Sequence, residues 1–213
     1  MTIRKKRSIL NGMIIILTVL AWCIMAARNR VGGFWESGLA NIRYFTVMSN
    51  VFRGGISVAI LVSFKRNTGM EEGKKLAVWN YVATSAVGLT FLVVFAFFAP
   101  LAGLVSVLGP ANFFFHLVIP VLAMADYILY NAWPIRMPVK LAAMIPPLLY
   151  GMSHLFNLLI TGVGGRAHSN DWYGFATWGL PIGLCIFAAI CGCALLVGFL
   201  LSLANKRVLE RRE

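Results

Sequence analysis

Polar side chains able to carry chemistry are few in this sequence, and they lie within apolar segments. His116 follows three phenylalanines and precedes Leu117-Val118-Ile119. An imidazole titrates close to neutral pH, so it can take a proton from a hydroxyl group. A threonine with a neighbouring base is an arrangement that makes a nucleophile. Thr46, in a second apolar segment, is the candidate hydroxyl for His116.

Membrane-spanning helices must position these side chains. Of the 213 residues, 60% are hydrophobic and 12% are charged, which is far from the balance of a water-soluble domain. A helix needs about 20 apolar residues to cross about 30 Å of hydrocarbon. Such windows lie at 8–27, 42–64, 76–100, 110–131, 139–161 and 175–203. The sequence therefore predicts an all-α, six-helix membrane bundle, and the short connections predict a single domain over residues 1–213.

The basic residues predict the orientation of the bundle. With six spans, fourteen lysines and arginines fall on the side of the two termini and four fall in the alternate connections. The positive-inside rule then places both termini in the cytoplasm. This placement explains the net charge of +12 without a nucleic-acid partner. The basic N-terminus is expected to lead into an uncleaved first helix, because 8–27 is long enough to span.

The topology gives each polar residue a depth, because a helix rises about 1.5 Å per residue. Thr46, His116 and His154 lie about 6, 9 and 10 Å below the outer boundary on this scale. Three helices thus bring these side chains to one layer, which predicts a site in the outer half of the bundle.

A second polar layer lies deeper. Arg53 and Asp126 are about 16 and 24 Å from the outer boundary, and a guanidinium can reach a carboxylate across that difference. Ionisable side chains are costly in hydrocarbon unless they are paired or used. We expect a structural ion pair between them. The alternative is a small-molecule or proton-coupled transporter that uses Arg53 and Asp126 as substrate contacts or proton carriers.

Two segments resemble a known family. The segment Arg43-Tyr44-Phe45-Thr46-Val47-Met48-Ser49-Asn50 and the segment His116-Leu117-Val118-Ile119-Pro120 resemble the threonine and histidine segments of the androgen-induced gene product and androgen-dependent regulator proteins. These are multi-pass threonine hydrolases of fatty acid esters of hydroxy fatty acids. Asp126-Tyr127 and Asp171-Trp172-Tyr173 resemble related bacterial integral membrane proteins.

The resemblance implies that Thr46 is the nucleophile and His116 its general base, with a lipid ester as substrate and no cofactor. It also implies a bacterial inner membrane as the location. Residues near the pair are candidates for binding substrate or stabilising the oxyanion, namely Ser49, Asn50, Asn112, His154 and Asn157. Asn50 is the preferred oxyanion donor, because it lies one helical turn from Thr46 on the same face.

The histidines offer a second candidate site. The three histidines, His116, His154 and His168, are all expected in the outer half, and three imidazoles can hold a catalytic zinc ion. Their spacing matches no zinc motif, so we expect no metal site.

In the last span, Gly179 and Gly183 have the GxxxG spacing that lets helices pack closely. Pro181 between them predicts a kink.

Overall fold

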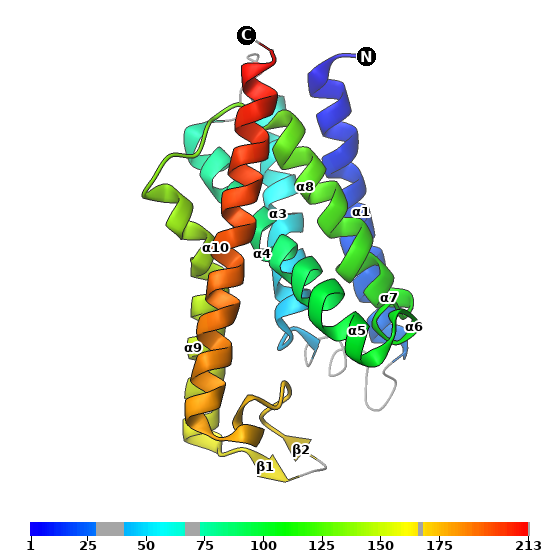
Figure 1. The fold of residues 1–213 in the computed structure, drawn as a ribbon. Coiled ribbons are helices and arrows are strands. Elements are labelled where there is room, and N and C mark those ends of the chain that lie inside the picture. The colour runs from blue at the N-terminus through cyan, green and yellow to red at the C-terminus, as the bar shows by residue number, and fades with distance from the viewer. Residues whose placement is uncertain (29–40, 67–72, 166–167, 213) are drawn as a thin grey trace.

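The structure is a computed structural model that describes residues 1–28, 41–66, 73–165 and 168–212. Its principal helices confirm the predicted all-α bundle, because six of its helical segments are long and apolar enough to span a membrane. Both chain termini lie at one end of the bundle (Figure 1). The spans are built from α1 (Ile3–Arg28), α3 (Phe45–Arg66), α4 (Lys74–Val93), α8 (Ile119–Tyr130), α9 (Ile145–Thr161) and α10 (Leu180–Glu210).

Short helical pieces extend three of these spans. Two of them are π-helical, which widens the helix by one residue and leaves backbone groups free for other contacts. The pieces are η1 (Val94–Phe98) and α5 (Ala99–Ala102) after α4, α7 (Pro110–Asn112) and η2 (Phe113–Val118) before α8, and the 3-10 helix η3 (Val139–Met144) before α9. The separate helix α6 (Leu104–Val107) connects the third span to the fourth.

The end opposite the termini carries the remaining elements (Figure 1). Strands β1 (Gly164–Gly165) and β2 (His168–Ser169) form a short antiparallel pair. The 3-10 helix η4 (Phe175–Trp178) then leads into α10. Figure 1 shows α9 and the beginning of α10 extending past the start of α3 at this end.

The last span differs from the prediction at both ends. Helix α10 begins at Leu180 and continues to Glu210, whereas the apolar window suggested 175–203. Pro181 lies in the first turn of the helix. It makes no mid-helix kink, because the N–H group that proline lacks has no intrahelical partner in the first turn. Gly179 precedes the helix with a φ of 84°, in the region that favours glycine.

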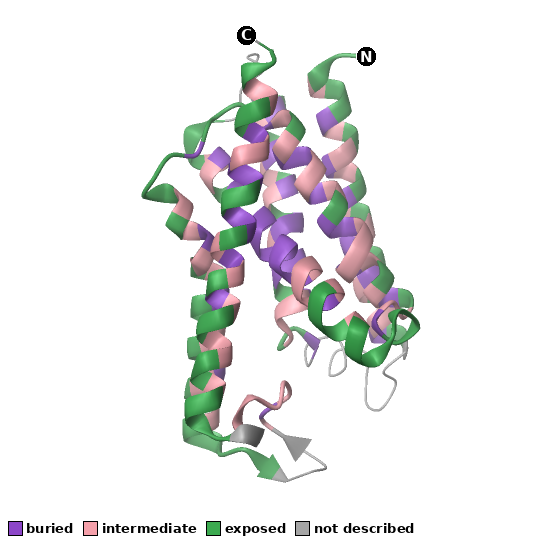
Figure 2. Cartoon of the chain, viewed as in Figure 1, coloured by how far each residue is buried: buried purple, intermediate pink, exposed green. Residues whose placement is uncertain are grey.

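Helix α4 is the centre of the bundle. Of its hydrophobic span 61% is buried, compared with 17% for the span that contains α9. Figure 2 shows the buried residues concentrated around α4 and on the facing sides of its neighbours. The outward faces of the other helices are largely apolar, as expected for helices surrounded by lipid. Helix α9 is therefore a peripheral helix, and Pro147 and His154 are its buried residues.

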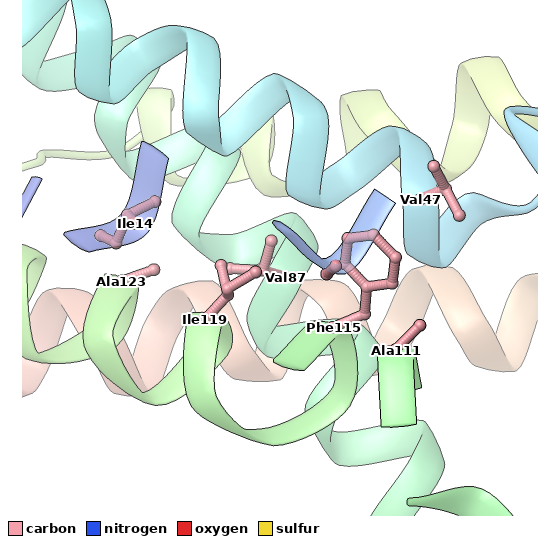
Figure 3. Close-up of a cluster of buried hydrophobic side chains, with 8 residues drawn as sticks. Ile14, Val47, Val87, Ala111, Phe115, Ile119 and Ala123 are labelled. Atoms are coloured by element: carbon pink, nitrogen blue, oxygen red, sulfur yellow. The ribbon is translucent and has the colours of Figure 1, made fainter. Parts of the chain in front are cut away.

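Two apolar clusters fill the interior. The first joins α1, α3, α4 and α8 with α7 and η2, and it contains Ile14, Val47, Val87 and Phe115 (Figure 3). The second surrounds Tyr81 and Tyr127 near the end that carries the termini. There Gly198 lets α10 approach closely, because a Cβ atom at this position would lie 2.4 Å from the Tyr81 hydroxyl oxygen.

Candidate functional site

Thr46 and His116 lie on neighbouring elements. Thr46 is in the first turn of α3, and His116 is in the π-helical segment η2. The residues next to them, Val47 and Phe115, belong to the same apolar cluster (Figure 3). Both side chains are partly buried. The two residues thus approach the same part of the bundle, as the depth estimate predicted.

The imidazole of His116 has a fixed orientation. Its Nδ1 atom lies 2.7 Å from the carbonyl oxygen of Val107 in α6. A carbonyl oxygen accepts only, so Nδ1 carries the hydrogen and Nε2 is left as the basic nitrogen. Among the described residues, no hydrogen bond to Nε2 is formed. His116 is therefore held in the tautomer that a general base requires.

Asn50 ties the two elements together. Its amide nitrogen donates to the carbonyl oxygen of Thr46, at 2.7 Å, and to that of Phe115, at 3.1 Å. Both N–H groups of the amide are thereby used, so Asn50 is not the free oxyanion donor that the sequence suggested. Its Oδ1 atom is buried and has no hydrogen-bond partner within the described chain. Asn50 holds the backbone next to His116 against the backbone of Thr46.

No hydrogen bond joins Thr46 to His116 in the described part of the chain. The Thr46 hydroxyl likewise has no hydrogen-bond partner among these residues. Thr46 and His116 therefore lie on neighbouring elements without the hydrogen bond that catalysis requires. Catalytic hydrogen bonds are often long or absent before substrate binds.

The other predicted members of this site differ in their contacts. Ser49 donates to the Thr46 carbonyl oxygen at 3.1 Å and lies 3.2 Å from the Thr90 hydroxyl. The side chains of Asn112 and Asn157 form no hydrogen bond within the described residues. His154 belongs to a different site, described below. From the predicted set, Asn50 and Ser49 thus bond to the Thr46 carbonyl, and Asn50 also bonds to the Phe115 carbonyl next to His116.

The expected ion pair between Arg53 and Asp126 is present. Arg53 Nη2 donates to Asp126 Oδ2 at 2.9 Å, and both side chains are fully buried. The carboxylate also accepts from Arg7 at 3.2 Å, from Asn11 at 2.8 Å and from Asn80 at 3.4 Å. Arg7 is one of the fourteen basic residues that the sequence places on the side of the termini, and it is buried instead of lying at the membrane surface. Asp126 therefore joins α1, α3 and α4 to α8.

His154 and Asp171 form a second polar pair, at the end opposite the termini. Their Nε2 and Oδ1 atoms are 3.1 Å apart, and both side chains are buried. Asp171 also accepts from the backbone N–H groups of Phe175, at 3.0 Å, and Ala176, at 2.7 Å. A carboxylate that accepts these bonds receives a hydrogen from Nε2 as well. The remaining nitrogen, His154 Nδ1, is a buried acceptor without a partner within the described chain.

Aromatic side chains surround His154. The Tyr150 ring lies parallel to the imidazole, with 6.4 Å between the ring centroids. The Trp172 ring meets the imidazole edge-on, with 4.4 Å between the centroids. Tyr150 donates to the Arg43 carbonyl oxygen at 2.7 Å and accepts from the Trp172 indole at 2.8 Å. These contacts fix α9 to the start of α3. Burial raises the pKa of the neighbouring Tyr173 phenol, so it stays neutral at physiological pH.

A cavity of about 450 Å³ opens beside this pair. We name it the lateral groove. Its lining comes from α3, α4, α9 and the segments that precede α3 and η4. The lining residues are Arg43, Phe45, Met48, Ser49, Phe52, Trp79, Val82, Ile145, Pro146, Leu149, Tyr150, Ser153, His154 and Trp172. Neither Thr46 nor His116 lines it.

The described residues contain no group of three or more His, Cys, Asp and Glu side chains able to hold a metal ion. The side chain of His168, the third histidine of the zinc alternative, lies outside the described residues. Asp171 has a part in the family resemblance, but the sequence does not indicate that it pairs with His154. An acidic residue just before a short helical turn, with a histidine on the preceding span, was the available signal. Comparisons with protein-family models, curated proteins and solved structures found no match.

Proposed function

We propose that the protein is an intramembrane hydrolase of lipid esters, with Thr46 as nucleophile and His116 as general base. The observation that carries the proposal is the Val107 carbonyl on His116 Nδ1, because it leaves Nε2 free to accept a proton. The hydrogen bonds from Asn50 to the Thr46 and Phe115 carbonyls support it, since they keep the two elements in register. The motif resemblance supplies the substrate class, fatty acid esters of hydroxy fatty acids among them.

The reaction follows from these roles. As substrate binds, the Thr46 hydroxyl approaches His116 Nε2 to within about 3 Å. Nε2 takes the hydroxyl proton while Oγ1 attacks the ester carbonyl carbon, and the alcohol leaves with that proton. Water then attacks the acyl-threonine while the same imidazole takes its proton, and that proton passes to Thr46 Oγ1 as the acyl–oxygen bond breaks and the free acid departs. The basic side chains around the termini support an orientation with this site toward the outer face of a bacterial inner membrane.

Transport through Arg53 and Asp126 is less well supported. Asp126 accepts from side chains of three other helices, and its carboxylate is fully buried. A proton carrier must alternate between bound and free states, whereas this carboxylate is enclosed by donors. The arrangement suits a structural role.

Ester hydrolysis by the purified protein in lipid vesicles tests the proposal. We expect Thr46→Ala and His116→Gln each to lower kcat at least about a hundredfold, with a double variant little worse than either. Thr46→Ser keeps a hydroxyl group and should retain partial activity. Thr161→Ala is the matched control, because this exposed threonine bonds only to nearby backbone carbonyl oxygens. Full turnover by a folded Thr46→Ala protein would refute the mechanism.

A further inference from the structure

The lateral groove has a polar end and an apolar end. Arg43, Tyr150, His154 and Trp172 gather where α9 meets the start of α3. The other end lies between Phe52, Trp79 and Ile145, where the rings of Phe52 and Trp79 are in edge contact at 6.1 Å. This division matches a ligand with one polar head and one apolar chain.

The groove has the length of one acyl chain of one leaflet. From His154 to Ile145, nine residues of α9 rise about 14 Å. That is about half of the 30 Å hydrocarbon thickness of a bilayer. Its wall is open to the surroundings of the bundle, because Met48, Trp79 and Leu149 are 44%, 51% and 61% exposed. In a membrane those surroundings are lipid, so a chain can enter sideways.

The polar end defines the head of the ligand. His154 Nδ1 is a buried acceptor without a partner within the described residues, so it requires a donor such as a hydroxyl group. Arg43 is exposed and forms no ion pair with a carboxylate among the described residues. Its guanidinium lies over the Trp172 ring at 5.6 Å, next to aromatic side chains typical of the headgroup level. A cation at that level matches a phosphate group.

We propose that the lateral groove binds a single-chain glycerophospholipid with a free glycerol hydroxyl group, a lysophospholipid. The hydroxyl group donates to His154 Nδ1, the phosphate contacts Arg43, and the acyl chain lies along α9 toward Trp79. Asp171 acts as a positioning residue, because it holds the hydrogen on Nε2 and so makes Nδ1 the acceptor. This site is independent of the proposed hydrolysis, since Thr46 does not line the groove.

Native mass spectrometry of the detergent-solubilised protein tests which polar head group the ligand carries. The probe is palmitoyl lysophosphatidic acid, which carries one hydroxyl group and one phosphate. We expect one bound copy, with affinity at least about tenfold above that of its deoxy analogue, in which hydrogen replaces the hydroxyl group. Monopalmitoylglycerol, palmitate and dipalmitoyl phosphatidic acid should each bind more weakly. Equal binding of the deoxy analogue, or tighter binding of palmitate, would overturn the assignment.

Variants of the groove supply the matched controls. Leu149→Trp fills the groove and should lower the affinity for lysophosphatidic acid at least about tenfold. Leu148→Trp places the same bulk on an exposed neighbour that does not line the groove and should leave the affinity unchanged. Equal effects of the two variants would contradict the site.

Two further variants test the polar contacts separately. Arg43→Gln should weaken the binding of lysophosphatidic acid and leave the binding of monopalmitoylglycerol unchanged, because only the first ligand carries a phosphate group. His154→Phe should abolish the preference for lysophosphatidic acid over the deoxy analogue. Because Arg43 is exposed, we expect Arg43→Gln to fold, and it tests the site even if His154→Phe does not fold. Unchanged binding by Arg43→Gln would overturn the phosphate contact.

Discussion

The side chains of Arg53 and Asp126 are in direct contact inside the bundle, with 2.9 Å between Nη2 and Oδ2 and no exposure of either. A second arginine, Arg7, reaches the other carboxylate oxygen at 3.2 Å. One acidic side chain therefore forms ion pairs with two basic ones, from α1 and α3. This unequal ratio predicts that the three residues differ in their importance for stability.

Asp126→Asn should be the most destabilising of the single changes in this network. It removes the carboxylate charge that both guanidinium groups contact, and loss of one partner from a buried ion pair costs about 3–5 kcal/mol. Arg53→Gln should cost less, because Asp126 keeps Arg7. Thermal unfolding in detergent measures the order. Lys206→Ala, which removes an exposed pair with Glu210, is the control and should cost less than about 0.5 kcal/mol. A smaller loss for Asp126→Asn than for Arg53→Gln would contradict the charge argument.

Two glycines of α10 form a matched test of the packing. Gly198→Ala should destabilise the bundle by about 1–3 kcal/mol, because its Cβ would lie 2.7 Å from the Cβ of Ala143. Gly192→Ala meets no atom within 4 Å and should stabilise the helix by about 0.5–1 kcal/mol. Unfolding midpoints of the two variants measure the contrast. Similar midpoints would show that α10 does not approach α4 and η3 this closely.

Asn50 should act on catalysis through the position of His116. Asn50→Ala removes both carbonyl contacts, so we expect kcat to fall while KM changes little, because both N–H groups of Asn50 are bonded to backbone carbonyl oxygens and not left for the substrate. Asn50→Asp should be worse, since a carboxylate would face two carbonyl oxygens. Steady-state kinetics with each folded variant measure this split. A rise in KM with kcat unchanged would assign Asn50 to substrate binding instead.

The orientation of the bundle is open to direct labelling. In a variant without its native cysteines, single cysteines at Thr2 and Arg212 should react with an impermeant maleimide only when the cytoplasmic face is open. A cysteine at Thr161 should react from the outside, because the exposed end of α9 lies opposite the termini. Labelling of residues 2 and 161 from the same side would contradict the six-span topology.

Hydropathy predicted the six spans because lipid exposure requires about 20 apolar residues in each helix. It could not define the start of α10, because residues 175–179 contain no charged side chain and only Gly179, with its φ of 84°, separates them from the helix. Arg7 was assigned to the surface with its basic neighbours. Only the packing of α1 against α8 shows that one member of that basic run turns inward to Asp126.

The candidate site was predicted in part for similar reasons. Depth along the helices placed Thr46 and His116 in one layer, since rise per residue is fixed. Depth carries no information about helix rotation, so it could not show that Thr46 is absent from the lining of the lateral groove. The roles of Asn50 and Asp171 depend on partners far along the chain, Phe115 and His154, which no local pattern reveals.

Mapping the covalent adduct of a fluorophosphonate probe tests the central claim most directly. Cleavage after Arg43 and Arg53 releases the peptide 44–53, which contains both Thr46 and Ser49, and fragmentation distinguishes the two. We predict an adduct on Thr46 in membranes that hold the wild-type protein, and its loss in His116→Gln. An adduct on Ser49, or ester hydrolysis by a protein that acquires no adduct on Thr46, would contradict the account.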